Sequence, residues 1–498
     1  FIGGDPNPYG PEIELKGAGP GNGASIAISR ASHVAVKGLC INGFDASLIS
    51  IAGSLPGSGE VTTDITVTGC YLGIDPTGTG CGSQSGCGLS AYHVVGLRIG
   101  GDSQIERNII SCAGNKYLSL AYCGDVEIVN NIIGTDRTGT VDLLSAPLGG
   151  VHLSHTVRPA LFRDNQVCSA YWDLVNISHT DPDSGQVRVI NNRLGEGVDG
   201  TPMSAIDGVE VRYSPGHFFK ENVIAHSRVW YGMYLHGDPT DYVTITRNSI
   251  YDCSHLGINL GNRNCTDQGV DLIDGAYGPG VNEEIDPCYC DSIVNRDDGG
   301  GGETMAFFTC MRDCTVEVFI GDHPGVWALC PLSGHGKVYS GKTYLGDARE
   351  VMAGPVFSTY RFAVSPALPE GTVLTSTATN GNGSTSEFGC TCQVPLAGES
   401  ARGCLPSAYR FFPPAPNPCS DGAAIRFHLP KACPVRINVY DSAGRDVARV
   451  AGARFEAGVH GLWWRAQDTR GRPLPSGSYV VRMETDEFVS SQQVMVVR

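Results

Sequence analysis

Between residues 30 and 265 the chain repeats one short pattern, and this repeat restricts the fold more than any other feature. Apolar residues alternate along each segment up to an Asn, and an apolar residue follows within two positions. The Asn positions are Asn108, Asn131, Asn165, Asn192, Asn222 and Asn248, with spacings of 23, 34, 27, 30 and 26 residues. Alternation with a period of two indicates strands rather than helices. Because strand repeats of this length stack as a solenoid, the pattern predicts a right-handed parallel β-helix.

The recurring Asn has a physical role at a corner between strands. An Asn side chain tolerates a left-handed backbone, and it can hydrogen-bond to the same Asn one coil away. We therefore expect the six Asn residues to form a ladder along the solenoid.

A second set of alternating segments predicts two columns of side chains on the outer surface. One column contains His152, Asn176, Glu210, Tyr234 and Asn259, and the next contains Ser154, Ser178, Arg212, His236 and Gly261. Polar groups that could contact a glycan gather where the columns adjoin, and indole rings nearby are suited to stacking on sugars. The candidate glycan-binding residues are Trp172, Glu210, Arg212, Trp230, Tyr234 and His236.

The same columns argue against catalysis. A hydrolase of this fold needs an acid and a base carboxyl group together, and a lyase needs a basic residue with a cation. Carboxylates are not paired in the predicted columns, and the chain contains no Asp-Pro-His-Glu string of the epimerase kind. We therefore assign no catalytic residue, and the sequence favours a protein without enzymatic activity.

Patterns along the chain indicate four parts of an all-β protein. We expect the β-helix over residues 1–287 and a disulfide-rich β-sandwich over 288–404. A linker rich in Pro and aromatic residues occupies 405–418, and a second immunoglobulin-like sandwich occupies 419–498.

Charge and hydropathy exclude two classes of partner. The 498 residues carry a formal net charge of −16, which repels phosphate backbones and argues against nucleic-acid binding. No apolar run reaches the roughly 18 residues of a membrane-spanning helix.

Nineteen cysteines indicate disulfides in an oxidising compartment rather than metal or haem ligation. The odd number leaves at least one thiol free or bonded to another molecule. The disulfide candidates are Cys81, Cys87, Cys288, Cys290, Cys310, Cys314, Cys330, Cys390, Cys392, Cys404, Cys419 and Cys433, of which Cys419 and Cys433 would clip the first hairpin of the last domain.

An acidic segment follows the repeat. Its carboxylates are Asp267, Asp271, Asp274, Glu283, Glu284 and Asp286. Calcium is the one cofactor that such a cluster of oxygens suggests. The spacing does not match an EF-hand loop, however, and we favour a solvated acidic linker, so no metal site is assigned.

The first 390 residues resemble bacterial secreted β-helix repeat proteins. The matching strings are residues 131–140, Leu256-Gly-Ile-Asn-Leu-Gly and the tail 377–388. In such proteins the stretch around Phe1-Ile-Gly-Gly lies inside an early coil, so the resemblance implies further chain before it.

The C-terminal part resembles the immunoglobulin-like domain of flagellar hook-capping proteins and of type IX secretion cargo. The resemblance runs from Pro416-Asn-Pro through 439–445 to 474–479, and it implies export and attachment at a cell surface.

Two hypotheses on function follow. The first is a secreted, non-catalytic surface protein, structural or adhesive, which attaches to the cell or assembles head-to-tail into a filament or layer. The alternative is a protein that binds or modifies polysaccharide on the outer face of the β-helix.

Overall fold

The structure is a computed structural model, in which the chain forms two compact units, residues 1–263 and 264–498. It describes residues 10–11, 13–17, 25–53, 62–82, 86–143, 147–181, 183, 185–203, 205–237, 239–261, 282, 288–296, 302–322, 326–328, 336–338, 340–354, 356–389, 391–395, 408–414 and 417–498. Within these ranges no helix is long and apolar enough to cross a membrane.

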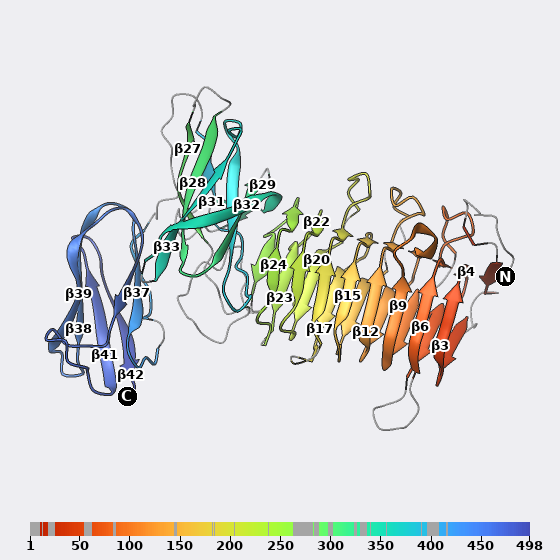
Figure 1. Cartoon of the computed structure of the whole chain (residues 1–498), viewed down its shortest axis with the longest axis horizontal. Coiled ribbons are helices and arrows are strands. Elements are labelled where there is room, and N and C mark those ends of the chain that lie inside the picture. Colours follow the sequence, from red (N-terminus) through yellow and green to blue (C-terminus); the bar gives the residue numbers. More distant parts are fainter. Residues whose placement is uncertain are drawn as a thin grey trace. The chain divides into compact units, whose positions relative to one another are not determined.

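Three sheets of parallel strands build the first unit, and the chain visits them in turn as it winds through successive coils (Figure 1). Sheet I contains β1 (Ile13–Lys16), β4 (Leu39–Asn42), β7 (Tyr71–Leu72), β10 (Ile109–Ile110), β13 (Ile132–Ile133), β16 (Gln166–Val167), β19 (Arg193–Leu194), β22 (Val223–Ala225) and β25 (Ser249–Tyr251). Sheet II contains β2 (Ile26–Ser29), β5 (Ile49–Ala52), β8 (Leu89–Tyr92), β11 (Lys116–Ala121), β14 (Gly149–Ser154), β17 (Asp173–Ser178), β20 (Asp207–Arg212), β23 (Met233–His236) and β26 (Ile258–Leu260).

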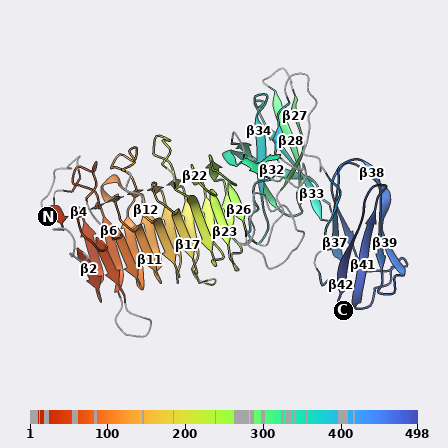
Figure 2. The ribbon, with the colours of Figure 1, turned by 180° about the vertical axis from the view of Figure 1, so that it is seen from behind.

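Sheet III completes each coil. Its strands are β3 (Ser32–Lys37), β6 (Thr62–Thr68), β9 (Val94–Gly100), β12 (Gly124–Val129), β15 (Ala160–Arg163), β18 (Val187–Ile190), β21 (Phe218–Lys220) and β24 (Thr244–Thr246). One turn of 3-10 helix, η1 (Gln104–Glu106), follows β9. The predicted parallel β-helix is confirmed, and Figure 2 shows its stacked coils from behind.

The interior of the β-helix follows from the alternation along sheet II. Five apolar residues pair in register through consecutive coils, and all are buried. They are Val151, Val175, Val209, Met233 and Ile258. Because a single coil cannot bury its own apolar face, this column stabilises each coil through its neighbours.

The six Asn residues form a continuous hydrogen-bonded ladder just before the sheet I strands. In each step Nδ2 of one Asn donates to Oδ1 of the Asn in the next coil, at 2.8–3.1 Å from Asn108 through Asn248. Nδ2 also donates to a backbone carbonyl, as from Asn165 to Ile128 at 2.8 Å. The side chains are buried, so these bonds replace the water that the amides would lose.

In the described residues of the second unit, the strands pair antiparallel. One bent sheet has the order β27 (Tyr289–Arg296), β28 (Glu303–Met311), β33 (Phe357–Val364), β32 (Gly341–Met352), β29 (Thr315–Gly321), β34 (Val373–Thr379) and β35 (Cys392–Gln393), beside the hairpin of β30 (Val326–Ala328) and β31 (Gly336–Val338). Phe308, Val318 and Leu374 lie in its core.

The C-terminal part packs two further sheets around a core that includes Phe427, Val439 and Val481. The first contains β36 (Arg410–Phe411), β37 (Ala423–Leu429) and β40 (Gly458–Trp464). The second contains β39 (Asp446–Phe455), β38 (Cys433–Tyr440), β41 (Gly477–Glu484) and β42 (Val489–Val496). The span 405–418, expected as a linker, thus contributes a strand that pairs with β37. The predicted all-β class, with a β-helix followed by sandwiches, is confirmed.

Two disulfides join cysteines that are far apart in sequence. Cys81 bonds to Cys112, 31 residues on, and Cys290 bonds to Cys392, 102 residues on. Several other candidates carry thiols: Cys87, Cys288, Cys310, Cys419 and Cys433. The expected clip between Cys419 and Cys433 is therefore not formed, and Cys330, Cys390 and Cys404 lie outside the described residues.

Candidate functional site on the outer face of sheet II

Four side chains from three neighbouring coils are joined by hydrogen bonds on the outer face of sheet II. They are Asp173, Asn176, Glu210 and His236. Asn176 of β17 pairs in register with Glu210 of β20, and Arg212 of β20 pairs with His236 of β23. Nδ2 of Asn176 donates to Oδ2 of Asp173 at 3.0 Å and also to Oε2 of Glu210. Nε2 of His236 lies 2.6 Å from Oε1 of Glu210. One amide thus joins two carboxyl groups, and the imidazole holds the second of them.

The two carboxyl groups differ in acidity. Burial raises the pKa of Asp173, and the negative charge of Glu210 raises it further. Burial also acts to raise the pKa of Glu210, but the hydrogen bond and charge of His236, with the charge of Arg212, outweigh it and lower the pKa. Asp173 therefore holds a proton at a pH where Glu210 is ionised, and the pair hydrogen-bonds directly.

Other titratable groups border this carboxyl pair. Burial raises the pKa of Asp207 to about 6, and its Oδ1 accepts a hydrogen bond from the backbone N–H of Tyr231 at 3.0 Å. Burial, followed by the charge of Lys116, lowers the pKa of His152 to about 4. The site therefore combines the neutral imidazole of His152, the protonated carboxyl group of Asp173 and the carboxylate of Glu210 on three consecutive coils.

The two predicted columns contain a single carboxylate, Glu210, and the second carboxyl group of the site, Asp173, lies outside both columns. Asp173 lies at the first position of β17, and Leu174 and Val175 behind it are both buried. Because two consecutive residues point inward, strict alternation fails there and Asp173 turns to the same face as Asn176. The structure pairs Asp173 in register with Asp207 of the next coil.

The six candidate glycan-binding residues differ in exposure: the polar side chains are buried or partly buried, and the two indoles are exposed. Glu210 and His236 are buried at 8% and 3% exposure, and Arg212 is partly buried. The Tyr234 ring stacks on His236 at 4.3 Å between centroids. The two indoles are exposed, Trp172 at 51% and Trp230 at 45%.

The indoles lie in one column at the start of the sheet II strands. The backbone N–H of Trp172 donates to the carbonyl of Leu148, that of Trp230 donates to the carbonyl of Ile206, and that of His255 donates to the carbonyl of Trp230. The backbone N–H of Asp207 donates to the carbonyl of Trp172, so the coil that contains Ile206 and Asp207 lies between the two indole residues. Two coil spacings place them about 10 Å apart. This indole column borders the carboxyl pair, because Trp172 directly precedes Asp173.

Aromatic rings also stack along the corner that follows the sheet II strands. His93, Tyr122, His155, His179 and Tyr213 each come directly after a strand, with φ between 48° and 55°. Consecutive ring centroids are 4.8, 4.4, 5.1 and 5.0 Å apart. A left-handed backbone costs about 1–2 kcal/mol for a residue with a Cβ, and ring stacking offsets that strain. The position directly after the second outward column carries this signal in the sequence.

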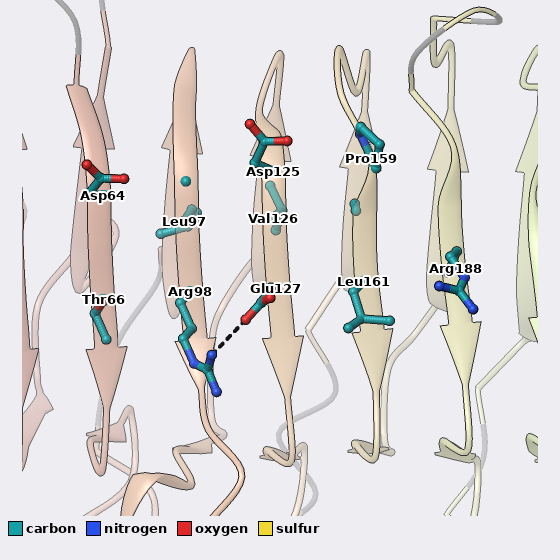
Figure 3. Close-up of a pocket in the computed structure, with 12 residues that line it drawn as sticks. Asp64, Thr66, Leu97, Arg98, Asp125, Val126, Glu127, Pro159, Leu161 and Arg188 are labelled. Carbon is teal, nitrogen blue, oxygen red and sulfur yellow. Dashed lines mark hydrogen bonds and ion pairs between the residues drawn. The ribbon is translucent and has the colours of Figure 1, made fainter.

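A hollow of about 530 Å³ lies on the outer face of sheet III, where Figure 3 shows Asp64, Asp125 and Arg188 on separate coils. Charged side chains of this hollow form ion pairs with side chains of neighbouring coils. The ion pairs are His33–Asp64 at 3.2 Å, Arg98–Glu127 at 2.8 Å and Arg158–Asp125 at 2.9 Å. These contacts hold neighbouring coils together, and the surface is less suited to proton transfer than the carboxyl pair on sheet II.

The acidic segment considered for calcium lies outside the described residues. Among the residues that are described, no group of three or more His, Cys, Asp or Glu side chains is arranged to hold a metal ion.

Comparison with known proteins identifies the C-terminal domain. Residues 419–487 match the FlgD Ig-like domain. The immunoglobulin-like domain expected there is confirmed. No curated protein matches the chain in sequence.

Solved structures resemble the chain at low identity. Dimeric latent PorU from Porphyromonas gingivalis is 15% identical over 42% of this chain and 20% of its own, with a TM-score of 0.17. A double mutant of the periplasmic alginate epimerase AlgG is 11% identical over 50% of this chain and 63% of its own, with a TM-score of 0.27. The A-module of the mannuronan C-5 epimerase AlgE4 from Azotobacter vinelandii is 14% identical over 51% of this chain and 76% of its own, with a TM-score of 0.27. The chain thus spans less than two thirds of the first two proteins.

Proposed function

We propose that this protein is secreted and binds polysaccharide along the outer face of sheet II. The observation that carries the proposal is the indole column, in which Trp172 and Trp230 stand exposed on one line with a single coil between them. Tyr171 and Val229, next to the two indoles in sequence, are also exposed, and apolar groups that gather on a surface in this way mark interaction sites.

An extended glycan suits this geometry for two reasons. Sugar rings present apolar faces that stack on indoles, and a polymer can reach both Trp172 and Trp230, about 10 Å apart. Glu210, the ionised member of the carboxyl pair beside the column, offers a charged acceptor for a sugar hydroxyl, and such charge-assisted bonds are stronger than neutral ones.

Disulfides support the secreted part of the proposal. The Cys81–Cys112 and Cys290–Cys392 bonds are typical of an oxidising, extracytoplasmic compartment. The FlgD Ig-like domain supplies a separate module through which the chain would attach at the cell surface.

Affinity electrophoresis through gels that contain soluble polysaccharides tests the binding. We expect Trp172→Ala and Trp230→Ala each to weaken retardation about 30-fold, the effect of losing a contact worth about 2 kcal/mol. Trp463→Ala is the matched control, because Trp463 is 44% exposed but belongs to the C-terminal domain. Equal loss with Trp463→Ala, or no retardation of the wild type by any polysaccharide, would refute the proposal.

The carboxyl pair supports a second candidate function, proton transfer at a carbon atom of the bound glycan. Asp173 and Glu210 are in hydrogen-bond contact, which is closer than the 5–9.5 Å that glycosidase carboxyl groups need. An acid and a base on the same side of the ring suit a syn elimination, in which the proton and the leaving group depart from one face, whereas epimerisation needs the two groups on opposite faces. Glu210→Gln would then abolish product formation while the indoles Trp172 and Trp230 keep most of the binding, and Glu127→Gln on sheet III would change neither. Absence of any product with the wild type would leave binding as the function.

Self-association forms the last part of the proposal. Copies that assemble head-to-tail would produce filaments or layers visible by negative-stain electron microscopy. Removing residues 405–498 would abolish assembly or surface attachment if the C-terminal domain is responsible, and unchanged assembly would contradict that role.

A further inference from the structure

The C-terminal domain is basic, unlike the rest of the chain. Residues 419–498 hold 11 of the 35 Lys and Arg residues but only 8 of the 51 Asp and Glu residues. Because net charge bears on the partners of a domain more than on its fold, this excess of cations points to an anionic partner.

Three of these arginines surround a groove of about 570 Å³ on the outer face of the sheet formed by β39, β38 and β41. Arg436 on β38 is opposite Gly452 on β39, and Pro434 is opposite Arg454. Alternation puts Val435 and Ile437 into the core and Arg436 outside. The three guanidinium groups of Arg436, Arg449 and Arg454 therefore share one exposed face.

Gly452 forms the floor of this groove. A Cβ atom at Gly452 would lie 3.3 Å from Cδ of Arg449, and no backbone atom comes within 4 Å of it. Because Gly452 has no side chain, the space beside the Arg449 side chain stays open. Glu484 and Asp486 stand at its rim.

The charges of this groove are only partly neutralised. Glu484 lies 3.6 Å from Arg436 and 3.0 Å from Arg482. Arg449 and Arg454 make no ion pair anywhere in the described part of the chain, although Arg454 donates to the carbonyl of Ala432 at 3.2 Å. Arginines in the turns of the same domain are paired, as Arg445 is with Asp441 at 2.7 Å and Arg472 with Asp468 at 2.8 Å.

We propose that this groove binds a phosphate or sulfate monoester group. Guanidinium groups bind such oxyanions through paired N–H donors, and Arg449 and Arg454 have donors to offer. A compact anion is favoured over a long polyanion, since the acidic remainder of the chain repels extended negative charge. The group would be presented either by a soluble sugar ester or by a lipid headgroup, and the chemistry at the arginines is the same.

Calorimetry on the full chain tests this proposal with inorganic phosphate and with glucose 6-phosphate. Saturable binding that weakens as salt is raised is expected for the wild type. Arg449→Gln and Arg454→Gln should each raise the Kd about tenfold, as for loss of one charge-assisted contact. Gly452→Asp should abolish binding, because it places a carboxylate at the floor.

Arg472→Gln is the matched control, since it removes the same charge from a paired arginine of the same domain. An unchanged Kd for this variant supports the groove as the site. Absence of saturable binding by the wild type, or equal loss with Arg472→Gln, would overturn the proposal. Flotation with vesicles of phosphatidylcholine, with and without phosphatidic acid, identifies the source: co-flotation with phosphatidic acid indicates a lipid headgroup, and its absence alongside saturable phosphate binding indicates a soluble ester.

Discussion

Nε2 of His236 lies 2.6 Å from Oε1 of Glu210, and the two residues belong to neighbouring coils. The contact helps keep Glu210 ionised in surroundings where burial would otherwise protonate it. Asp173, which has no such imidazole contact, keeps its proton at a higher pH. The coil-to-coil register of the β-helix thus produces two carboxyl groups of opposite character side by side.

The raised pKa of Asp207 predicts that the protein loses stability as the pH rises. Its folded pKa of about 6 lies above the usual value of 3.8, so its contribution is fully present below pH 3.8 and is lost as the pH rises through 6. That loss amounts to roughly 2–3 kcal/mol. Asp207→Asn keeps an acceptor for the N–H of Tyr231 and should remove this part of the pH dependence. Urea unfolding of wild type and variant at pH 4 and pH 7 measures it, and identical pH profiles would contradict the assignment.

His217 predicts the opposite trend at low pH. Burial lowers its pKa to about 3, and its Nδ1 accepts a hydrogen bond from the N–H of Val187 at 3.0 Å. Its contribution is present above pH 6.5 and is lost as the pH falls toward 3, by roughly 2–3 kcal/mol at pH 4.5. In His217→Asn the free energy of unfolding should fall less steeply between pH 6.5 and pH 4.5 than in the wild type, whether or not the variant is less stable at every pH. A slope equal to that of the wild type would exclude His217 as its source.

Removing one rung of the Asn ladder should destabilise the β-helix. Asn165→Ala deletes the amide that donates to Asn192 and Ile128, and it removes the oxygen that accepts from Nδ2 and from the backbone N–H of Asn131. We expect a loss of roughly 2–4 kcal/mol in the free energy of unfolding. Asn115→Ala, at an exposed position of the same β-helix, should cost about 0.5 kcal/mol or less. Similar losses for both variants would argue against the ladder as a source of stability.

The Cys81–Cys112 bond should contribute to stability in proportion to the loop that it closes. A separation of 31 residues corresponds to about 3–4 kcal/mol in the chain-entropy model. The double variant Cys81→Ser/Cys112→Ser should unfold at correspondingly lower urea concentration under oxidising conditions. Under reducing conditions the difference from the wild type should shrink, and peptide mapping without reduction would establish the pairing.

The β-helix could be predicted from the sequence because its signals are local. Alternation and the recurring Asn residues each lie within a few positions, and register then repeats from coil to coil. The pairing of Asp173 with Glu210 could not be predicted in this way, since it depends on a break in alternation at Leu174 and Val175. The partner of Cys81 is equally hidden, because it depends on which loops of neighbouring coils meet.

Every rung of the Asn ladder is chemically the same. Asn165 donates to Asn192, and Asn192 donates in the same manner to Asn222. If residues 166–192 were deleted as one block, Asn165 would face Asn222 and the bond would form again with the same two atoms. Growth or shortening of this β-helix by whole coils therefore needs no new side-chain chemistry in the ladder.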